Sequence, residues 1–152
     1  TRTGDPIYNM YRKVGALEAD TVIHNAPSIR LEVGGEMVDV PLVFEKFREF
    51  LLKRAAGDED RIEAILQDIK VMMQTEMPLG APTNLKEILQ FLFKGRGFLT
   101  IARKHGKESV KEYLAPLKSD KVRQILYRLM PGDYSAVGLI MMLGTRMRRT
   151  AG

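Results

Sequence analysis

Alternation of apolar and polar residues predicts one β-hairpin in the first third of the chain. Residues 29–33 alternate between apolar and charged side chains, which is the period of a strand with one buried face. Gly34 and Gly35 follow, and a two-residue hairpin turn needs the positive φ that glycine adopts readily. Pairing across this turn places Leu31 opposite Val38, so the apolar face continues from one strand to the next.

Apolar residues spaced three and four apart predict helices on both sides of this hairpin. Before it, a stripe from Ile7 to Val14 follows a capping Asp5-Pro6 start, and the β-branched segment 21–24 is a candidate third strand. After it, helical stripes cover residues 44–51, 62–73, 85–92, 110–114, 122–129 and 134–147.

Capping patterns predict where several of these helices begin. Asn84 with Glu87, and Ser109 with Glu112, have the spacing of a capping box, in which the two side chains bond each other's backbone amides. Further caps are expected at Ser119 and at Asp133, the latter before a last helix that begins at Tyr134.

Together these elements predict an α+β fold that is mostly helical. A small antiparallel β-hairpin or three-stranded sheet is expected to pack on six or more helices. We expect a single domain over residues 1–152, with a proline- and glycine-containing linker at 77–82 as its best internal boundary. Its parts are then a helix plus hairpin (1–40), a helical pair (41–77) and a basic helical part (84–149).

Composition excludes several kinds of chemistry. The chain has no cysteine, which rules out disulfides, thiolate metal ligands and a cysteine nucleophile, and its two histidines are too few for a metal cluster. We expect His105 to be a cation at a helix C-terminus and His24 to lie on a strand without a special task. Asp58, Glu59 and Asp60 are expected to be surface acids that complement a helix start.

Charge is distributed unevenly along the chain. Residues 1–85 contain ten Lys/Arg and fourteen Asp/Glu, whereas residues 86–152 contain fourteen and five, so the net charges are −4 and +9. A solvated helical surface is the favoured interpretation, with contact to an anionic membrane or an acidic partner as the functional alternative. The residues named for that contact are Lys94, Arg96, Arg103, Lys104, Arg146, Arg148 and Arg149.

Three segments give the chain a resemblance to a known family. Residues 4–15 form the first, and residues 28–40 with Val43-Phe44 and the acidic helix start at 58–62 form the second. The third is the series of capped helices at 109–114, 119–126 and 133–136. In these segments the chain resembles the substrate region of FAD-dependent oxidoreductases of the phytoene desaturase and carotenoid isomerase type, which are amine-oxidase-like enzymes.

The resemblance implies a function as part of a larger flavoprotein. No Gly-x-Gly-x-x-Gly turn follows a strand here, and the nearest candidate, Gly95-Arg96-Gly97, is better interpreted as a break between two helices. We therefore expect a fragment that binds no cofactor, contributes no catalytic residue and is inactive alone. FAD would be held by a missing domain of the same parent chain.

The partner implied on this interpretation is a lipophilic, isoprenoid-like small molecule, with desaturation or isomerisation as the reaction. Five apolar residues are the candidates for its binding surface: Phe91, Phe93, Phe98, Met141 and Met142. A cytoplasmic location with peripheral membrane contact is expected. The alternative is a non-enzymatic helical interaction module that binds an acidic partner or an anionic membrane surface. Nucleic acid is disfavoured because no binding motif accompanies the net charge of +5.

Overall fold

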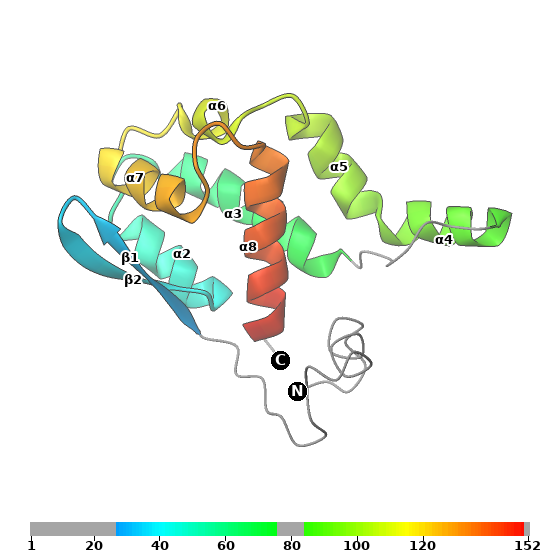
Figure 1. The fold of residues 1–152 in the computed structure, drawn as a ribbon, viewed down its shortest axis with the longest axis horizontal. Coiled ribbons are helices and arrows are strands. Elements are labelled where there is room, and N and C mark those ends of the chain that lie inside the picture. The colour runs from blue at the N-terminus through cyan, green and yellow to red at the C-terminus, as the bar shows by residue number, and fades with distance from the viewer. Residues whose placement is uncertain (1–26, 76–83, 151–152) are drawn as a thin grey trace, which may run out of the picture.

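A computed structural model describes residues 27–75 and 84–150, which contain one two-stranded sheet and seven helices (Figure 1). The expected helix at Ile7–Val14, the strand at 21–24 with His24, and the linker at 77–82 lie outside the described residues. The elements, in order, are β1 (Ser28–Val33), β2 (Glu36–Pro41), α2 (Phe44–Leu52), α3 (Glu59–Gln74), α4 (Leu85–Lys94), α5 (Arg96–His105), α6 (Val110–Leu114), α7 (Asp120–Leu129) and α8 (Ala136–Thr150). The mostly helical α+β class is confirmed.

The hairpin forms with the register that the apolar pattern predicts. Strands β1 and β2 are antiparallel with Leu31 opposite Val38, and Gly34 and Gly35 both have positive φ, 59° and 83°. The apolar face packs against α2 and α7, where Val40 is fully buried. Within the described residues the sheet has these two strands.

Helices α3 and α8 cross at the centre of the molecule and form its most extensive helix–helix contact (Figure 1). Their buried faces carry Ile65, Ile69 and Met72 on α3 and Leu143 on α8. Gly144 permits the close approach, because a Cβ atom there would lie 2.6 Å from the Cβ of Met72. The buried side chains form one core that runs from the hairpin to α8.

Three of the predicted caps, at Asn84, Ser109 and Ser119, are present, whereas the helix for which Asp133 was the expected cap begins three residues after it. Ser109 and Glu112 form a capping box at the start of α6, and Ser119 accepts a hydrogen bond from the amide of Val122 at the start of α7. The prediction that the last helix begins at Tyr134 was wrong, because α8 begins at Ala136. The residues before Ala136 instead pair with the segment before α6: the Val110 amide donates to the Tyr134 carbonyl, and the Ala136 amide to the Glu108 carbonyl.

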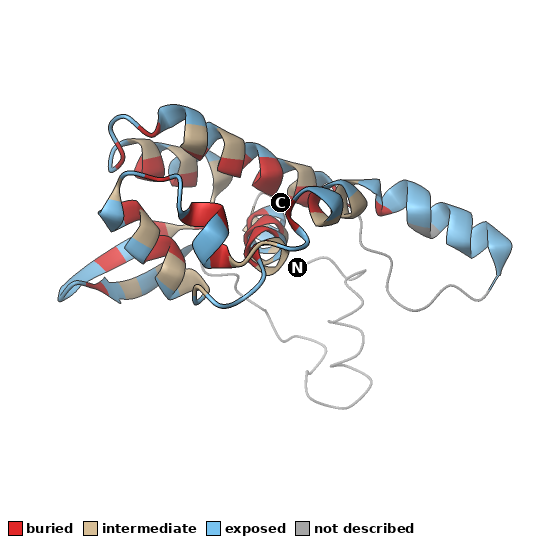
Figure 2. Cartoon of the chain, turned by 90° about the horizontal axis from the view of Figure 1, so that it is seen from above, coloured by how far each residue is buried: buried red, intermediate tan, exposed pale blue. Residues whose placement is uncertain are grey.

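Helix α4 stands apart from the rest of the fold. It extends away from the core in Figure 1, and in Figure 2 it is exposed along nearly its whole length. Asn84 caps it by accepting a hydrogen bond of 2.9 Å from the Glu87 amide. Among the described residues its main contact with another element is with α5, so its position depends on that junction.

Candidate functional site

The apolar side of α4 is exposed, and it carries five of the eight exposed large hydrophobic side chains among the described residues. Five large side chains at helical spacing, which we call the α4 face, have exposed fractions between 41% and 73%: Leu85, Ile88, Leu89, Leu92 and Phe93. Soluble domains rarely leave such a contiguous apolar face open unless it meets a ligand, a partner or a membrane. The α4 face is therefore the first candidate for a binding surface.

A row of polar residues borders the α4 face. Leu85, Leu89 and Phe93 lie on one ridge of the helix, and Lys86, Gln90 and Lys94 lie on the neighbouring ridge. The two ridges line a shallow open groove. The Arg96 guanidinium lies 5.3 Å above the centroid of the Phe93 ring, within the range of a cation–π interaction. Positive charge is thus placed along the border of the apolar surface.

The base of α4 is held where the ends of α3, α5 and α8 meet. A Cβ atom on Gly97 would lie 2.0 Å from the Thr75 hydroxyl oxygen, so the glycine lets α5 approach the end of α3. Arg148 on α8 donates a hydrogen bond of 2.8 Å to the Thr75 carbonyl. Gly95 separates α4 from α5, which confirms the predicted helix break at Gly95-Arg96-Gly97. Within this segment Gly95 is buried and Gly97 packs against the end of α3.

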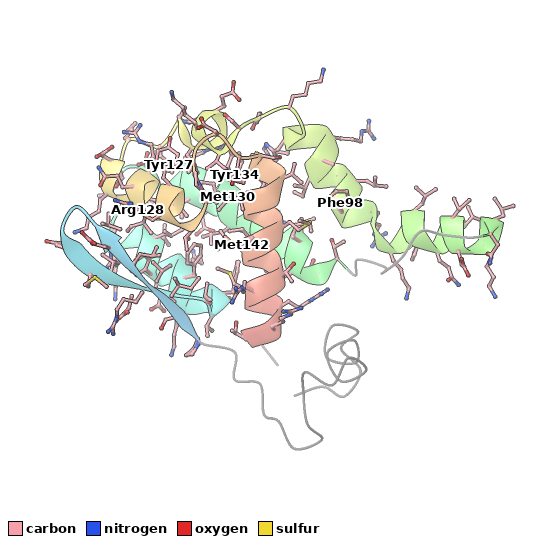
Figure 3. All side chains as sticks on the ribbon, viewed as in Figure 1. Phe98, Tyr127, Arg128, Met130, Tyr134 and Met142 are labelled. Atoms are coloured by element: carbon pink, nitrogen blue, oxygen red, sulfur yellow. The ribbon has the colours of Figure 1, made fainter. Side chains whose placement is uncertain are left out.

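The residues predicted to bind a lipophilic substrate do not form one surface. Phe93 is 71% exposed on α4, and Met141 is 37% exposed on α8. Phe98 on α5 and Met142 on α8 instead pack partly against the core (Figure 3). Phe91 lies on α4, but its side chain is outside the described part of the structure. Only Phe93 belongs to the α4 face.

The members of the predicted basic cluster lie on α4, α5 and α8. Lys94 and Arg96 lie at the junction of α4 and α5, while Arg103 and Lys104 lie at the opposite end of α5. The remaining members, Arg146, Arg148 and Arg149, lie near the C-terminal end of α8. Lys104 forms an ion pair of 2.9 Å with Asp68, and Arg148 bonds the Thr75 carbonyl. Lys94 and Arg96 are therefore the members of the predicted set that adjoin the α4 face.

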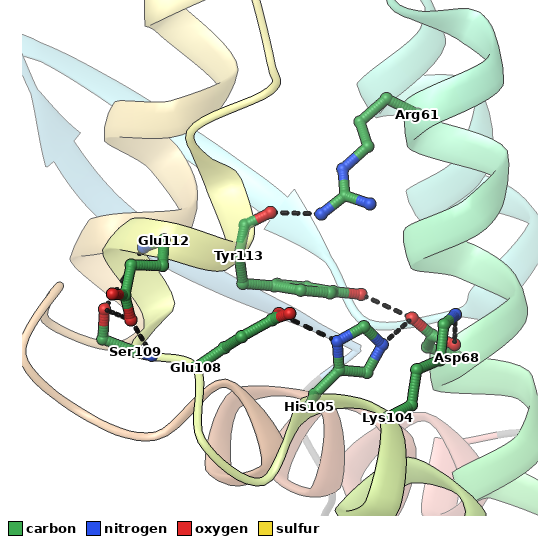
Figure 4. Close-up of polar contacts among 8 residues, drawn as sticks. All are labelled: Arg61, Asp68, Lys104, His105, Glu108, Ser109, Glu112 and Tyr113. Atoms are coloured by element: carbon green, nitrogen blue, oxygen red, sulfur yellow. Dashed lines mark hydrogen bonds and ion pairs between the residues drawn. The ribbon is translucent and has the colours of Figure 1, made fainter.

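A second candidate site is a buried polar cluster, which we call the Asp68 cluster: Asp68, Lys104, His105, Glu108 and Tyr113 (Figure 4). The Asp68 carboxylate accepts hydrogen bonds from Lys104 Nζ at 2.9 Å, from His105 Nε2 at 3.0 Å and from the Tyr113 hydroxyl at 2.9 Å. The other ring nitrogen of His105, Nδ1, lies 2.9 Å from Glu108 Oε2. Asp68 and His105 are each only 4% exposed.

His105 lies between two acidic side chains. Its two ring nitrogens are within hydrogen-bond distance of carboxylate oxygens of Asp68 and Glu108, and Lys104 pairs with the other oxygen of Asp68. The predicted helix C-terminal position of His105 is confirmed, because α5 ends at this residue. Its burial between two carboxylates was not predicted.

Tyr113 completes the cluster from α6. Its ring lies edge-on to the His105 ring, with centroids 4.8 Å apart and an interplanar angle of 74°. Burial, and then the neighbouring negative charge of Asp68, raise the pKa of the Tyr113 phenol, so it remains a hydrogen-bond donor. Arg61 on α3 donates to the Tyr113 carbonyl and lies over its ring. The cluster thereby joins α3, α5 and α6.

The Asp68 cluster has the residue types of an acid–base site but not the access that such a site needs. A general base must come within hydrogen-bond distance of the proton that it removes. His105 is 4% exposed and both its nitrogens already have partners. We therefore assign the cluster a structural role, which is to fix the packing of three helices.

One sequence signal was available for this cluster. Asp68 lies three residues after Ile65 and four before Met72, so it falls on the apolar stripe of α3. A carboxylate on a buried face needs hydrogen-bonding partners, because burying an unpaired charge is strongly unfavourable. The identity of those partners comes from the tertiary structure, since they lie 36 to 45 residues further along the chain.

Asp58 also differs from the prediction. It was expected to be a surface acid, but it is 4% exposed, and its carboxylate accepts hydrogen bonds from the backbone amides of Lys118 and Ser119. These two bonds lower the pKa of Asp58 below its ordinary value. Asp58 thus attaches the start of α3 to the turn before α7. Glu59 and Asp60 are exposed, as predicted.

Comparisons with known proteins add no identity. No protein-family model, curated protein or solved structure matches this chain. Within residues 27–75 and 84–150, no group of three or more histidine or acidic side chains is arranged to hold a metal ion. In the same ranges, no helix combines the length and the apolar character needed to cross a bilayer.

Proposed function

We propose that this chain forms the substrate side of a flavin-dependent oxidoreductase that acts on a lipophilic, isoprenoid-like molecule. The flavin would be held by another domain of the same parent protein. The proposal rests on the resemblance of the three sequence segments described above. The structural observation that supports it best is the open α4 face, because an apolar surface without a covering element suits a missing domain or an apolar ligand.

On this proposal the redox chemistry belongs to the flavin, and the residues of this chain bind and orient. Leu89 and Phe93 would contact an apolar chain, and their burial by substrate would exclude water from that side of the site. Met141 is the other exposed member of the predicted set and would contribute from α8. Phe98 and Met142 would act indirectly by supporting the helices from the core.

The first test is the sequence that flanks these residues in the gene, together with the absorption spectrum of the full-length protein. A Gly-x-Gly-x-x-Gly turn after a strand in the flanking sequence, and the absorption bands of bound flavin in the full-length protein, are expected. A full-length protein that binds no flavin when supplied with FAD would refute the proposal.

The second test examines the role of the α4 face in the full-length enzyme. Phe93→Ser is expected to raise KM for an apolar substrate by roughly tenfold, because an aromatic side chain that buries its area on binding contributes about 1.5–3 kcal/mol. Met37→Ser is the matched control, since Met37 is 64% exposed but lies on β2. Equal kinetics for the two variants would count against a substrate-binding α4 face.

The second candidate function is an interaction module without redox chemistry. The lysines beside the α4 face favour it, because a basic border suits an anionic partner. The flavin spectrum of the full-length protein distinguishes the two candidates: bound flavin supports the oxidoreductase, and its absence supports the module.

A further inference from the structure

We propose that α4 is a membrane-docking helix that lies in the plane of an anionic phospholipid bilayer. The α4 face would enter the boundary between headgroups and acyl chains, and the adjoining cations would contact lipid phosphates. The inference stands on the exposure, geometry and charge of α4. It adds a membrane location to the proposed function, because a lipophilic substrate would be delivered from the same membrane. Membrane docking by α4 does not itself require a flavin.

The shape of the α4 face suits a fluid apolar medium. With 3.6 residues per turn, its five members span an arc of about 140° around the helix axis. Every member is at least 41% exposed, so the arc is open over its full width. Ten residues give a length of about 15 Å, which suffices for in-plane contact and is far too short to cross a bilayer.

The charge around α4 complements an anionic surface. From Asn84 to Arg96 the chain contains three Lys/Arg, at positions 86, 94 and 96, and one acid, Glu87. Lys86 and Lys94 lie on the ridge next to the apolar one, where the aliphatic stem of Lys86 can follow the apolar surface while its ammonium group reaches a phosphate. Leucine and phenylalanine on one face with lysine on the other is the composition of interfacial helices.

Two other occupants suit the α4 face less well. A second copy of this chain would bring two strongly basic segments together, and like charges at an interface oppose association. A protein groove commonly takes a helix through anchors at i, i+3, i+4 and i+7, and Leu85, Ile88, Leu89 and Leu92 have this spacing. Phe93 at i+8 widens the apolar arc beyond that row, and the lysine ridge beside it favours an anionic bilayer over a groove.

The test uses a tryptophan reporter, because the chain contains no tryptophan. Phe93→Trp places the reporter on the α4 face, and Tyr134→Trp is the matched control at a site that is 60% exposed and distant from α4 (Figure 3). Emission is recorded with vesicles of phosphatidylcholine alone and of phosphatidylcholine with phosphatidylglycerol. We expect a blue shift for Phe93→Trp on the anionic vesicles, reduced by high salt, and no shift for Tyr134→Trp.

Substitutions in the Phe93→Trp background separate the apolar and charged contributions. Leu89→Ser and Lys86→Glu are each expected to weaken vesicle partitioning by about fivefold or more. Met37→Ser and Lys53→Glu, exposed positions on other elements, are the controls and are expected to leave it unchanged. Because the altered side chains are exposed, circular dichroism should show unaltered folding for all four.

Three results would overturn the proposal. The first is a Phe93→Trp reporter whose emission does not respond to anionic vesicles. The second is dimerisation in the absence of lipid, measured by sedimentation and abolished by Leu89→Ser, which would assign the face to a second copy. The third is binding to an acidic polypeptide but not to vesicles. Since neither flavin nor substrate is present, each result is independent of the oxidoreductase proposal.

Discussion

Replacing Asp68 tests whether the Asp68 cluster stabilises the fold. The Asp68 carboxylate accepts three hydrogen bonds, and two of the donors, His105 Nε2 and the Tyr113 hydroxyl, are buried. In Asp68→Asn, the remaining oxygen can still accept from these two donors while the new amide group faces Lys104, whose side chain is 56% exposed and can turn to water. The variant thus keeps the geometry and removes the negative charge.

The magnitude follows from the kinds of hydrogen bond involved. A hydrogen bond to a charged group contributes about 1.5–3 kcal/mol, and a hydrogen bond between neutral groups contributes about 0.5–1.5 kcal/mol, so Asp68→Asn should lower the free energy of unfolding by about 2 kcal/mol. Asp68→Ala leaves both buried donors without an acceptor, and removing one member of a buried pair typically lowers stability by about 3–5 kcal/mol. The two variants should therefore differ by at least about 1 kcal/mol.

The assay is urea unfolding of the complete chain at pH 7, followed by circular dichroism. The matched control is Asp60→Asn, which changes an exposed acid on the same helix and should lower stability by less than about 1 kcal/mol. Tyr113→Phe, alone and combined with Asp68→Asn, measures the coupling between these residues. If Asp68→Asn and Asp60→Asn have equal effects, the assigned structural role is wrong.

Three further predictions concern packing and pH. Gly144→Ala should lower the free energy of unfolding by about 1–3 kcal/mol, because its Cβ would lie 2.6 Å from Met72 Cβ. The control is Gly138→Ala on the same helix, which meets only the flexible Met130 side chain at 3.4 Å and should raise the free energy of unfolding by up to about 1 kcal/mol. Equal effects of the two substitutions would contradict the close approach of α3 and α8. The folded-state pKa of Asp58 is lowered, so its contribution to stability is present above about pH 4 and is lost as the pH falls through the folded value. The urea midpoint of Asp58→Asn should therefore fall less between pH 5 and pH 3 than that of the unaltered chain. An equal fall would exclude this contribution. The pKa of Tyr113 is raised, so its contribution to stability is complete below about pH 10 and declines above that pH. Between pH 9 and pH 11, Tyr113→Phe should therefore lose less stability than the unaltered chain in the same unfolding assay.

Local rules account for the parts of the fold that could be predicted from the sequence. The hairpin register follows from a two-residue glycine turn and a period of two, both of which act over about a dozen residues. The capping box at Ser109 and Glu112 likewise involves atoms within one helical turn. Before α8, a longer-range contact competes with these local rules, because Ser135 pairs with Ser109. As a result α8 begins at Ala136, two residues after the predicted start.

The sequence by itself therefore determined the fold class, the hairpin and most helix boundaries, because their energetics are local. Only the tertiary structure decided which stripes are covered: the stripe of α3 is buried beneath α8, whereas the equally apolar stripe of α4 is open. It also brought Asp68, His105 and Tyr113 together and separated the basic residues that composition had grouped. Such contacts join residues far apart in the chain, so periodicity and spacing carry no information about them.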